Sequence, residues 1–162
     1  MKPSVNSYQL LVEATNIKNP TLITLNQIQN PIFAIDLIFM NQTYPKTEKL
    51  KKKKYIDLLF SEGHSVSKYP LRLVYVPAKD LDVPLQMGVS VSKRYFKKAV
   101  DRNYFKRVLR ECYRLNKEIL LNDLQEPYVM MFFYQTKERL TYKEIEEKTV
   151  ALFGKFSFQK NK

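Results

Sequence analysis

The clearest chemical signal in this sequence is a group of polar side chains between residues 102 and 114. At roughly 100° per residue, a helix would gather them within an arc of about 140°. All but one are cationic, and guanidinium and ammonium groups bind phosphate oxygens. The group is Arg102, Asn103, Lys106, Arg107, Arg110 and Arg114. The spacing therefore predicts a surface that binds a polyanion, with an ordinary solvated face as the alternative.

A second arc of the same predicted helix, about 120° wide, holds apolar side chains that can pack against a core. These are Phe105, Val108, Leu109, Cys112 and Leu115. Asp101 and Glu111 are the only acidic residues between positions 99 and 114. A solvated helix, in contrast, usually pairs opposite charges four residues apart. We therefore expect one face of this helix to be buried and the other to meet phosphate.

The net charge of +12 over 162 residues narrows the classes of partner. Nucleic acid is the leading candidate, because neutralising phosphates releases condensed counterions. A membrane surface ranks lower, since the apolar faces are needed for a core. The length suits one domain, and 44% hydrophobic residues can supply that core.

The inventory of reactive residues is small. Cys112 is the only cysteine, which excludes an intrachain disulfide and favours a reducing compartment, the cytoplasm. His64 is the only histidine, and no cluster has metal-ligand spacing. We expect the protein to contain no catalytic residue, no metal site and no cofactor site of its own.

The first 45 residues differ in composition from the rest of the chain. Their only charged residues are Lys2, Glu13, Lys18 and Asp36. Polar residues interrupt the apolar stretch 21–40, so it is a poor membrane span, and no signal-peptide pattern is present. We expect residues 1–45 to be an N-terminal extension outside the fold. The alternative is a start assigned too far upstream, with Met40 as the true start.

Residues 46–158 carry the pattern of a folded domain, and 159–162 form a basic tail. Thr47 is a possible N-cap of a first helix, which Gly63 closes after about Ser61. Strands are predicted at 71–77, 85–92 and 128–134, the last covered on both faces. The basic helix extends to about Leu121, with a possible break at 99–102, and a capping box at 141–144 begins the last helix.

The predicted order is helix, two strands, helix, strand, helix (α-β-β-α-β-α). This order indicates an α+β fold, in which three helices pack on a small mixed sheet of the four-stranded type.

One run of residues reads Gly88-Val89-Ser90-Val91-Ser92-Lys93-Arg94. After a short spacer, a second run reads Ala99-Val100-x-Arg102-Asn103-x-x-Lys106-Arg107-x-x-Arg110-Glu111. Together the two runs resemble the signature of the bacterial ribonuclease P protein subunit. Phe60-Ser61-Glu62-Gly63-x-Ser65-Val66 is similar to the end of the family's first helix. The resemblance extends from Thr47 to the C-terminal helix, and residues 1–45 have no counterpart in it.

The resemblance implies an α/β sandwich with a left-handed crossover, against the usual right-handed rule. It also implies that the protein cleaves no bond itself. It would join a catalytic RNA that uses Mg²⁺ to release the 5′ leader of precursor tRNA, making it part of a cytoplasmic endoribonuclease. The expected partners are that RNA and the leader, with no membrane and no further protein required.

The resemblance also implies two sets of site residues. The expected contacts with the catalytic RNA are Lys93, Arg94, Arg102, Asn103, Lys106, Arg107, Arg110 and Arg114. The expected leader-binding cleft contains Ile56, Phe60 and either Val74 or Tyr75, for which core packing is the alternative.

Tyr104 departs from the family pattern, which often has a second arginine at this position. The tyrosine loses one cation but can stack on a base or donate a hydrogen bond. The sequence is also compatible with two other functions. One is a generic basic RNA-binding module such as a ribosomal protein. The other is a nuclease that acts without RNA, for which the sequence lacks a convergent set of carboxylates and histidines.

Overall fold

The computed structural model describes residues 42–122 and 124–160, which form one α+β unit around a four-stranded sheet. Its elements are η2 (Lys46–Glu48), α3 (Lys53–Glu62), β1 (His64–Lys68), β2 (Leu71–Pro77), β3 (Leu85–Val91), α4 (Ala99–Leu121), β4 (Tyr128–Tyr134) and α5 (Tyr142–Lys160).

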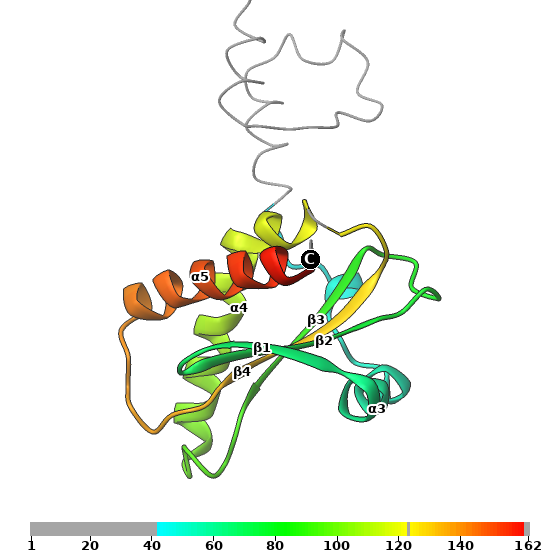
Figure 1. Cartoon of the computed structure of the whole chain (residues 1–162). Coiled ribbons are helices and arrows are strands. Elements are labelled where there is room, and N and C mark those ends of the chain that lie inside the picture. Colours follow the sequence, from blue (N-terminus) through cyan, green and yellow to red (C-terminus); the bar gives the residue numbers. More distant parts are fainter. Residues whose placement is uncertain (1–41, 123, 161–162) are drawn as a thin grey trace, which may run out of the picture. The chain divides into compact units, whose positions relative to one another are not determined.

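The sheet has the strand order β1-β2-β4-β3 (Figure 1). β1 pairs antiparallel with β2 and β2 antiparallel with β4, whereas β3 and β4 are parallel. A parallel pair needs a long crossover, and α4 provides it. The mixed sheet and three helices confirm the predicted fold class, while the left-handed sense of the crossover stays a prediction.

The helices lie on both faces of the sheet, α4 and α5 on one and α3 on the other (Figure 1). Strand alternation sorts the side chains between the faces. On β4, Tyr128, Met130, Phe132 and Tyr134 join the large core beneath α4 and α5. Val129 joins a smaller core with Tyr55 and Leu59 of α3.

Most predicted elements are confirmed, with two bounds changed. The strands at 71–77 and 128–134 match, the strand at 85–92 ends one residue earlier, and α4 runs unbroken from Ala99 to Leu121. The capping box is also present: the backbone N–H of Thr141 donates to the Glu144 carboxylate at 2.8 Å, and the backbone N–H of Glu144 donates to Thr141 Oγ1 at 3.4 Å.

The predicted start of the first helix is wrong. Thr47 lies in η2, and α3 begins at Lys53 without a side-chain cap. The intervening segment pairs with β3 instead, through the Leu50 backbone N–H, which donates to the Met87 carbonyl at 3.1 Å, and a Lys49–Met87 bridge. Contact with the edge strand thus overrides the local helical preference of the lysine run.

β1 is absent from the predicted element order. Its five residues are all exposed except Val66, so it lacks the apolar alternation that marks a strand. The strand forms because it pairs with β2 along its whole length. Only tertiary pairing makes this polar segment extended.

Residues 42–45, which the sequence assigned to the extension, pack against α4. The Tyr44 ring meets the edge of the Tyr113 ring at a centroid distance of 5.2 Å. Burial raises the pKa of Tyr44 to about 12, so its hydroxyl stays protonated and donates to the Met87 carbonyl. The prediction for the rest of the extension lies outside the described residues. At the other end, α5 continues through Lys160, so the predicted tail begins as helix.

A buried ion pair fixes the start of the described chain to α4. Lys117 Nζ, on a side chain only 5% exposed, donates to Glu48 Oε1 at 2.8 Å and to the Thr43 carbonyl at 2.7 Å. The Tyr113 hydroxyl donates to the same carboxylate at 3.2 Å. Glu48 thereby anchors η2, which sets the position of the chain just before α3.

We expect Lys117→Met to lower the free energy of unfolding by about 2–3 kcal/mol, because Glu48 would lose its buried partner. The loss stays below that of a fully buried pair, since the Glu48 side chain is 19% exposed and keeps some hydration. Urea unfolding measures the change. The double variant Glu48→Gln/Lys117→Met should recover more than half of it, and an equally unstable double variant would contradict the explanation.

Candidate nucleic-acid interface

The two arcs predicted for the basic helix are present on α4. Phe105, Leu109 and Cys112 are buried on the core side, and burial raises the pKa of the Cys112 thiol to about 11. Arg107 and Arg110 are exposed on the other side. The buried thiol packs as a small apolar group, which agrees with a structural role for Cys112.

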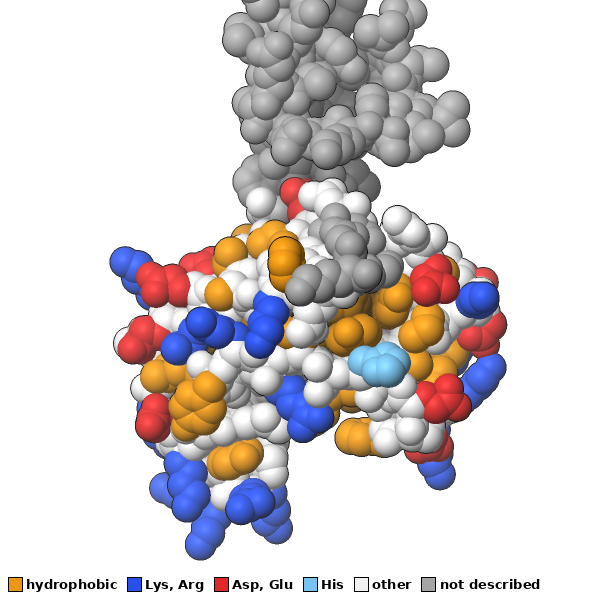
Figure 2. Space-filling model, viewed as in Figure 1, with side chains coloured by type: hydrophobic (Ala, Val, Ile, Leu, Met, Phe, Trp, Pro, Cys, Tyr) orange, Lys and Arg blue, Asp and Glu red, His pale blue; other side chains and the backbone are white. Residues whose placement is uncertain are grey.

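Several cations of this interface have no acidic partner within residues 42–122 and 124–160. On α4 they are Lys106, Arg107 and Arg110, and before α4 they are Lys93 and Arg94. Figure 2 shows Lys and Arg side chains gathered over the segment that joins β3 to α4. Their N–H donors can therefore bind external phosphates without first breaking an ion pair.

Two arginines of the predicted set are held by the protein itself. Arg102 donates from one guanidinium nitrogen to the carbonyls of Phe96 and Lys97, at 2.9 and 2.6 Å. Those bonds shape the turn that begins α4. A guanidinium has five N–H donors, so Arg102 retains others for phosphate.

Arg114 is bound more completely. It makes two hydrogen bonds to the Glu111 carboxylate, at 2.9 and 2.6 Å, and a third to the Gln42 carbonyl at 2.7 Å. These hydrogen bonds hold the pKa of Glu111 below its usual range. We therefore expect Arg114 to contribute less to phosphate binding than Arg107 or Arg110.

The other face of the sheet carries an apolar surface beside α3. α3 has only ten residues and covers Val76 and Val129. The next residues along the same face, Val74, Met131 and Phe133, remain half-buried. We call the set Arg72, Val74, Ser90, Met131 and Phe133, together with Phe60 of α3, the α3-side surface.

The strand registers bring these residues together. Val74 lies opposite Met131, and Phe133 lies between Arg72 and Ser90 on its two neighbouring strands. Phe60 is 68% exposed and Ile56 precedes it by one turn of α3. The structure thus brings α3, which carries Phe60, and Val74 to the same face of the sheet.

Tyr75 does not belong to this surface. It points to the opposite face, where its ring meets the edge of the Phe156 ring at a centroid distance of 4.7 Å. Successive strand residues alternate between faces, so Val74 and Tyr75 cannot both line the same cleft. Of the two, only Val74 lies on the face that α3 covers, and its place in a leader-binding cleft stays a prediction.

Arg72, Ser90, Met131 and Phe133 were not predicted from the sequence as site residues. The signal for β4 was a continuous apolar run, which predicted that both faces would be covered. Only the structure shows that the end of β4 beyond Val129 is incompletely covered on the α3 side.

Gly63 places the end of α3 against β2. A Cβ at this position would lie 2.1 Å from the Leu59 carbonyl oxygen and 2.8 Å from Val74 Cγ1. The backbone atom cannot move without disturbing the helix end, so this close approach requires glycine. Gly63 therefore sets the distance between the end of α3 and β2.

Residues 42–122 and 124–160 contain no group of three or more His, Cys, Asp or Glu residues that could hold a metal ion. None of their helices is both long and apolar enough to cross a membrane.

Comparison with known proteins identifies the family. Residues 44–157 match the sequence model of the family described as Ribonuclease P. The chain belongs to the ribonuclease P protein family. Among its relatives, the ribonuclease P protein component of Clostridium botulinum (strain Loch Maree / Type A3) is 32% identical over 111 residues, which cover 68% of this chain and 95% of that protein.

The ribonuclease P protein component of Porphyromonas gingivalis (strain ATCC BAA-308 / W83) is 45% identical over 82 residues, or 50% of this chain. The match spans 60% of the length of that relative. Two solved structures share the ribonuclease P protein fold, those from Staphylococcus aureus and Thermotoga maritima, each with a TM-score of 0.55 and 23% identity. They cover 65% and 67% of this chain, and 91% and 96% of their own lengths are matched.

Proposed function

We propose that this chain is the protein subunit of a ribonuclease P holoenzyme, a ribonucleoprotein that matures the 5′ ends of tRNA. In this role it binds the catalytic RNA and the 5′ leader of precursor tRNA, and it aids removal of the leader by endonucleolytic cleavage. The observation that carries the proposal is the family match over residues 44–157, joined to a basic α4 face on which Lys106, Arg107 and Arg110 have no acidic partner in the described residues.

The α4 face is proposed to dock on the catalytic RNA. Lys106, Arg107 and Arg110 lie on one side of a long, well-packed helix, so their spacing is preset before binding. Lys93 and Arg94 extend the same charge in front of the helix. Phosphate neutralisation of this kind supplies affinity and orientation rather than sequence choice.

The α3-side surface is proposed to hold the single-stranded leader. Accessible aromatic rings bind unpaired bases by stacking, and the exposed Phe60 and the half-buried Phe133 offer such rings. Arg72, whose guanidinium donates to Ser65 Oγ at 3.1 Å, supplies a cation beside Phe133 for the leader backbone. The two faces of the sheet thus have separate tasks, with the catalytic RNA on the α4 side and the leader on the α3 side.

The chemistry of cleavage is proposed to belong to the RNA subunit and its Mg²⁺ ions. The protein's own residues then position the substrate: the α4 cations fix the protein on the RNA and the α3-side surface fixes the leader. We place this function in the cytoplasm and propose that it requires no other protein.

Reconstitution tests the proposal. The full chain is mixed with a bacterial ribonuclease P catalytic RNA and precursor tRNA at low Mg²⁺. We expect the protein to stimulate leader removal, to cleave nothing alone, and to lose stimulation when the leader is shortened. Affinity for precursor tRNA that does not depend on leader length would instead indicate a generic basic RNA-binding module. Cleavage by the protein alone would overturn the assignment of the chemistry to RNA.

We expect Phe60→Ala to weaken holoenzyme binding of precursor tRNA by about 1–3 kcal/mol, the stacking energy of one base. The affinity of the holoenzyme for mature tRNA, which has no leader, should not change. Phe158→Ala is the matched control, since Phe158 on α5 is 66% exposed and Phe60 is 68% exposed. Equal effects of the two variants would show that exposed aromatic area alone, and not this surface, is responsible.

A further inference from the structure

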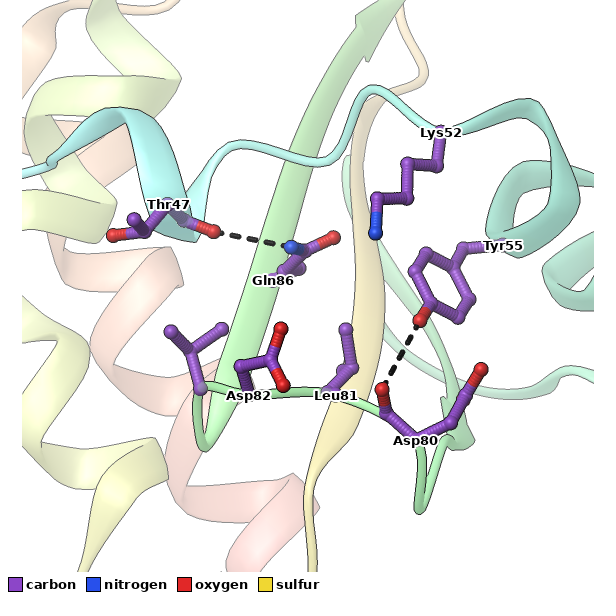
Figure 3. Close-up of a pocket in the computed structure, with 8 residues that line it drawn as sticks. Thr47, Lys52, Tyr55, Asp80, Leu81, Asp82 and Gln86 are labelled. Atoms are coloured by element: carbon purple, nitrogen blue, oxygen red, sulfur yellow. Dashed lines mark hydrogen bonds between the residues drawn. The ribbon is translucent and has the colours of Figure 1, made fainter.

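A small polar pocket lies at the start of α3, away from both surfaces described above. It has a volume of about 110 Å³ and lies between the residues before α3, the loop from β2 to β3, and the first residues of β3 (Figure 3). A single water needs roughly 10–15 Å³ by the same measure, so the pocket has room for more than one water. Phe60 lies near the other end of α3, which separates this pocket from the α3-side surface.

Gln86 leaves a buried acceptor in this pocket. Its amide nitrogen donates to the Thr47 carbonyl at 3.1 Å, which fixes the orientation of the amide. Its Oε1 atom is buried and has no hydrogen-bond partner within the described residues. Figure 3 shows this oxygen directed into the pocket, toward the side of Lys52 and Tyr55. A buried acceptor without a partner costs free energy, so this position favours a ligand that brings an N–H donor.

The other groups around the pocket extend this pattern. Asp82 lines it and forms no ion pair with another described residue, whereas Asp80 is bound to Lys54 at 2.6 Å. Lys52 supplies a donor, its ammonium lying 5.7 Å from the centroid of the Tyr55 ring. Among the polar groups of the pocket are therefore the Gln86 and Asp82 acceptors and the Lys52 donor, beside the Tyr55 ring.

Lysine side chains that can bind a phosphate lie next to the pocket. Lys51 and Lys53 flank Lys52, are exposed, and have no acidic partner within residues 42–122 and 124–160. A ligand that combines a hydrogen-bonding ring with a phosphate is a nucleotide. Among the bases, guanine presents two adjacent N–H donors and one acceptor on the edge that pairs, which complements two acceptors and one donor.

We propose that this pocket binds the base of an unpaired guanine nucleotide in the RNA, with Gln86 and Asp82 accepting from the base and Lys52 donating to it. The flanking lysines hold the adjoining phosphates. The inference rests on the proposed function for its RNA ligand, but it assigns a nucleotide site beyond the leader surface and the α4 face.

The test measures the affinity of the full chain for four RNA pentamers, UUGUU, UUIUU, UUAUU and UUUUU, where I is inosine. Inosine lacks the exocyclic amino group of guanine and so removes one donor. We expect UUGUU to bind about 10-fold tighter than the other three, the effect of one or two lost base contacts. This comparison uses the native protein and does not depend on any variant folding.

Variants of the protein test whether this pocket is the source of the preference for guanine. Gln86→Leu and Asp82→Ala should abolish the preference for guanine, and Gln159→Leu, on the exposed side of α5, should keep it. Equal affinities for all four pentamers would mean that the pocket holds only water, and would overturn the proposal. So would a preference that survives Gln86→Leu but is lost in Phe60→Ala. A guanine preference without stimulation in the reconstitution assay would refute the proposed function and leave this site standing.

Discussion

Replacing Lys106, Arg107 and Arg110 together with alanine is expected to weaken binding of the ribonuclease P catalytic RNA severely. Each lost phosphate contact lowers the slope of log affinity against log salt by about 0.7–0.9, so three contacts lower it by about 2–3. The three side chains are on the solvent side of α4 and have no acidic partner in the described residues, so their removal breaks no internal ion pair. Filter binding over a series of salt concentrations measures the slope.

The control removes the same charge elsewhere. Lys79, Lys137 and Lys143 are exposed and lie outside α4. Their triple alanine variant carries the same net charge as the α4 variant, so a purely nonspecific attraction would change equally in both. We expect the control to keep nearly the native slope. An unchanged slope in the α4 variant would show that this face is not the docking surface.

Phe105→Ala is expected to lower the free energy of unfolding by about 3–5 kcal/mol, the usual effect of emptying a buried aromatic site. Phe105 is 1% exposed. Its ring stacks between Phe96 and Tyr134, with centroid distances of 4.6 and 4.7 Å. The cavity would therefore open between the turn before α4 and the end of β4. Urea or thermal unfolding measures the loss.

The adjacent tyrosine provides a matched comparison. Tyr104 is 53% exposed and touches Phe105 only through an edge contact at 5.1 Å. Tyr104→Ala should cost less than about 1 kcal/mol, as surface substitutions usually do. A loss that small for Phe105→Ala would mean that the core beneath α4 relaxes around the cavity. The exposed ring also leaves Tyr104 able to stack on a base, which stays a prediction.

The region from β3 to the end of α4 could be predicted from local patterns, apart from the last residue of the strand and the break expected at 99–102. Leu85, Met87, Val89 and Val91 alternate with polar residues, and the apolar arc of α4 repeats at helical spacing. Both patterns arise from local geometry, because a half-buried strand or helix must place its apolar residues on one side. The same local regularity allowed the family to be recognised.

The parts that were not predicted depend on contacts between distant residues. β1 has no apolar pattern and exists through its pairing with β2. Residues 47–52 do not join the helix, because Leu50 bonds to Met87 of β3. Val74 and Tyr75 were equal candidates until the sheet register placed them on opposite faces.

The sequence by itself determined that the chain has a basic, amphipathic helix, an α+β domain and the signature of the ribonuclease P protein family. Only the tertiary structure decided which charges remain available. Lys117 is bound by Glu48 and Lys54 by Asp80, whereas Arg107 and Arg110 have no acidic partner in the described residues. Those partners lie tens of residues away, and no local period records a contact that the fold creates between separate segments.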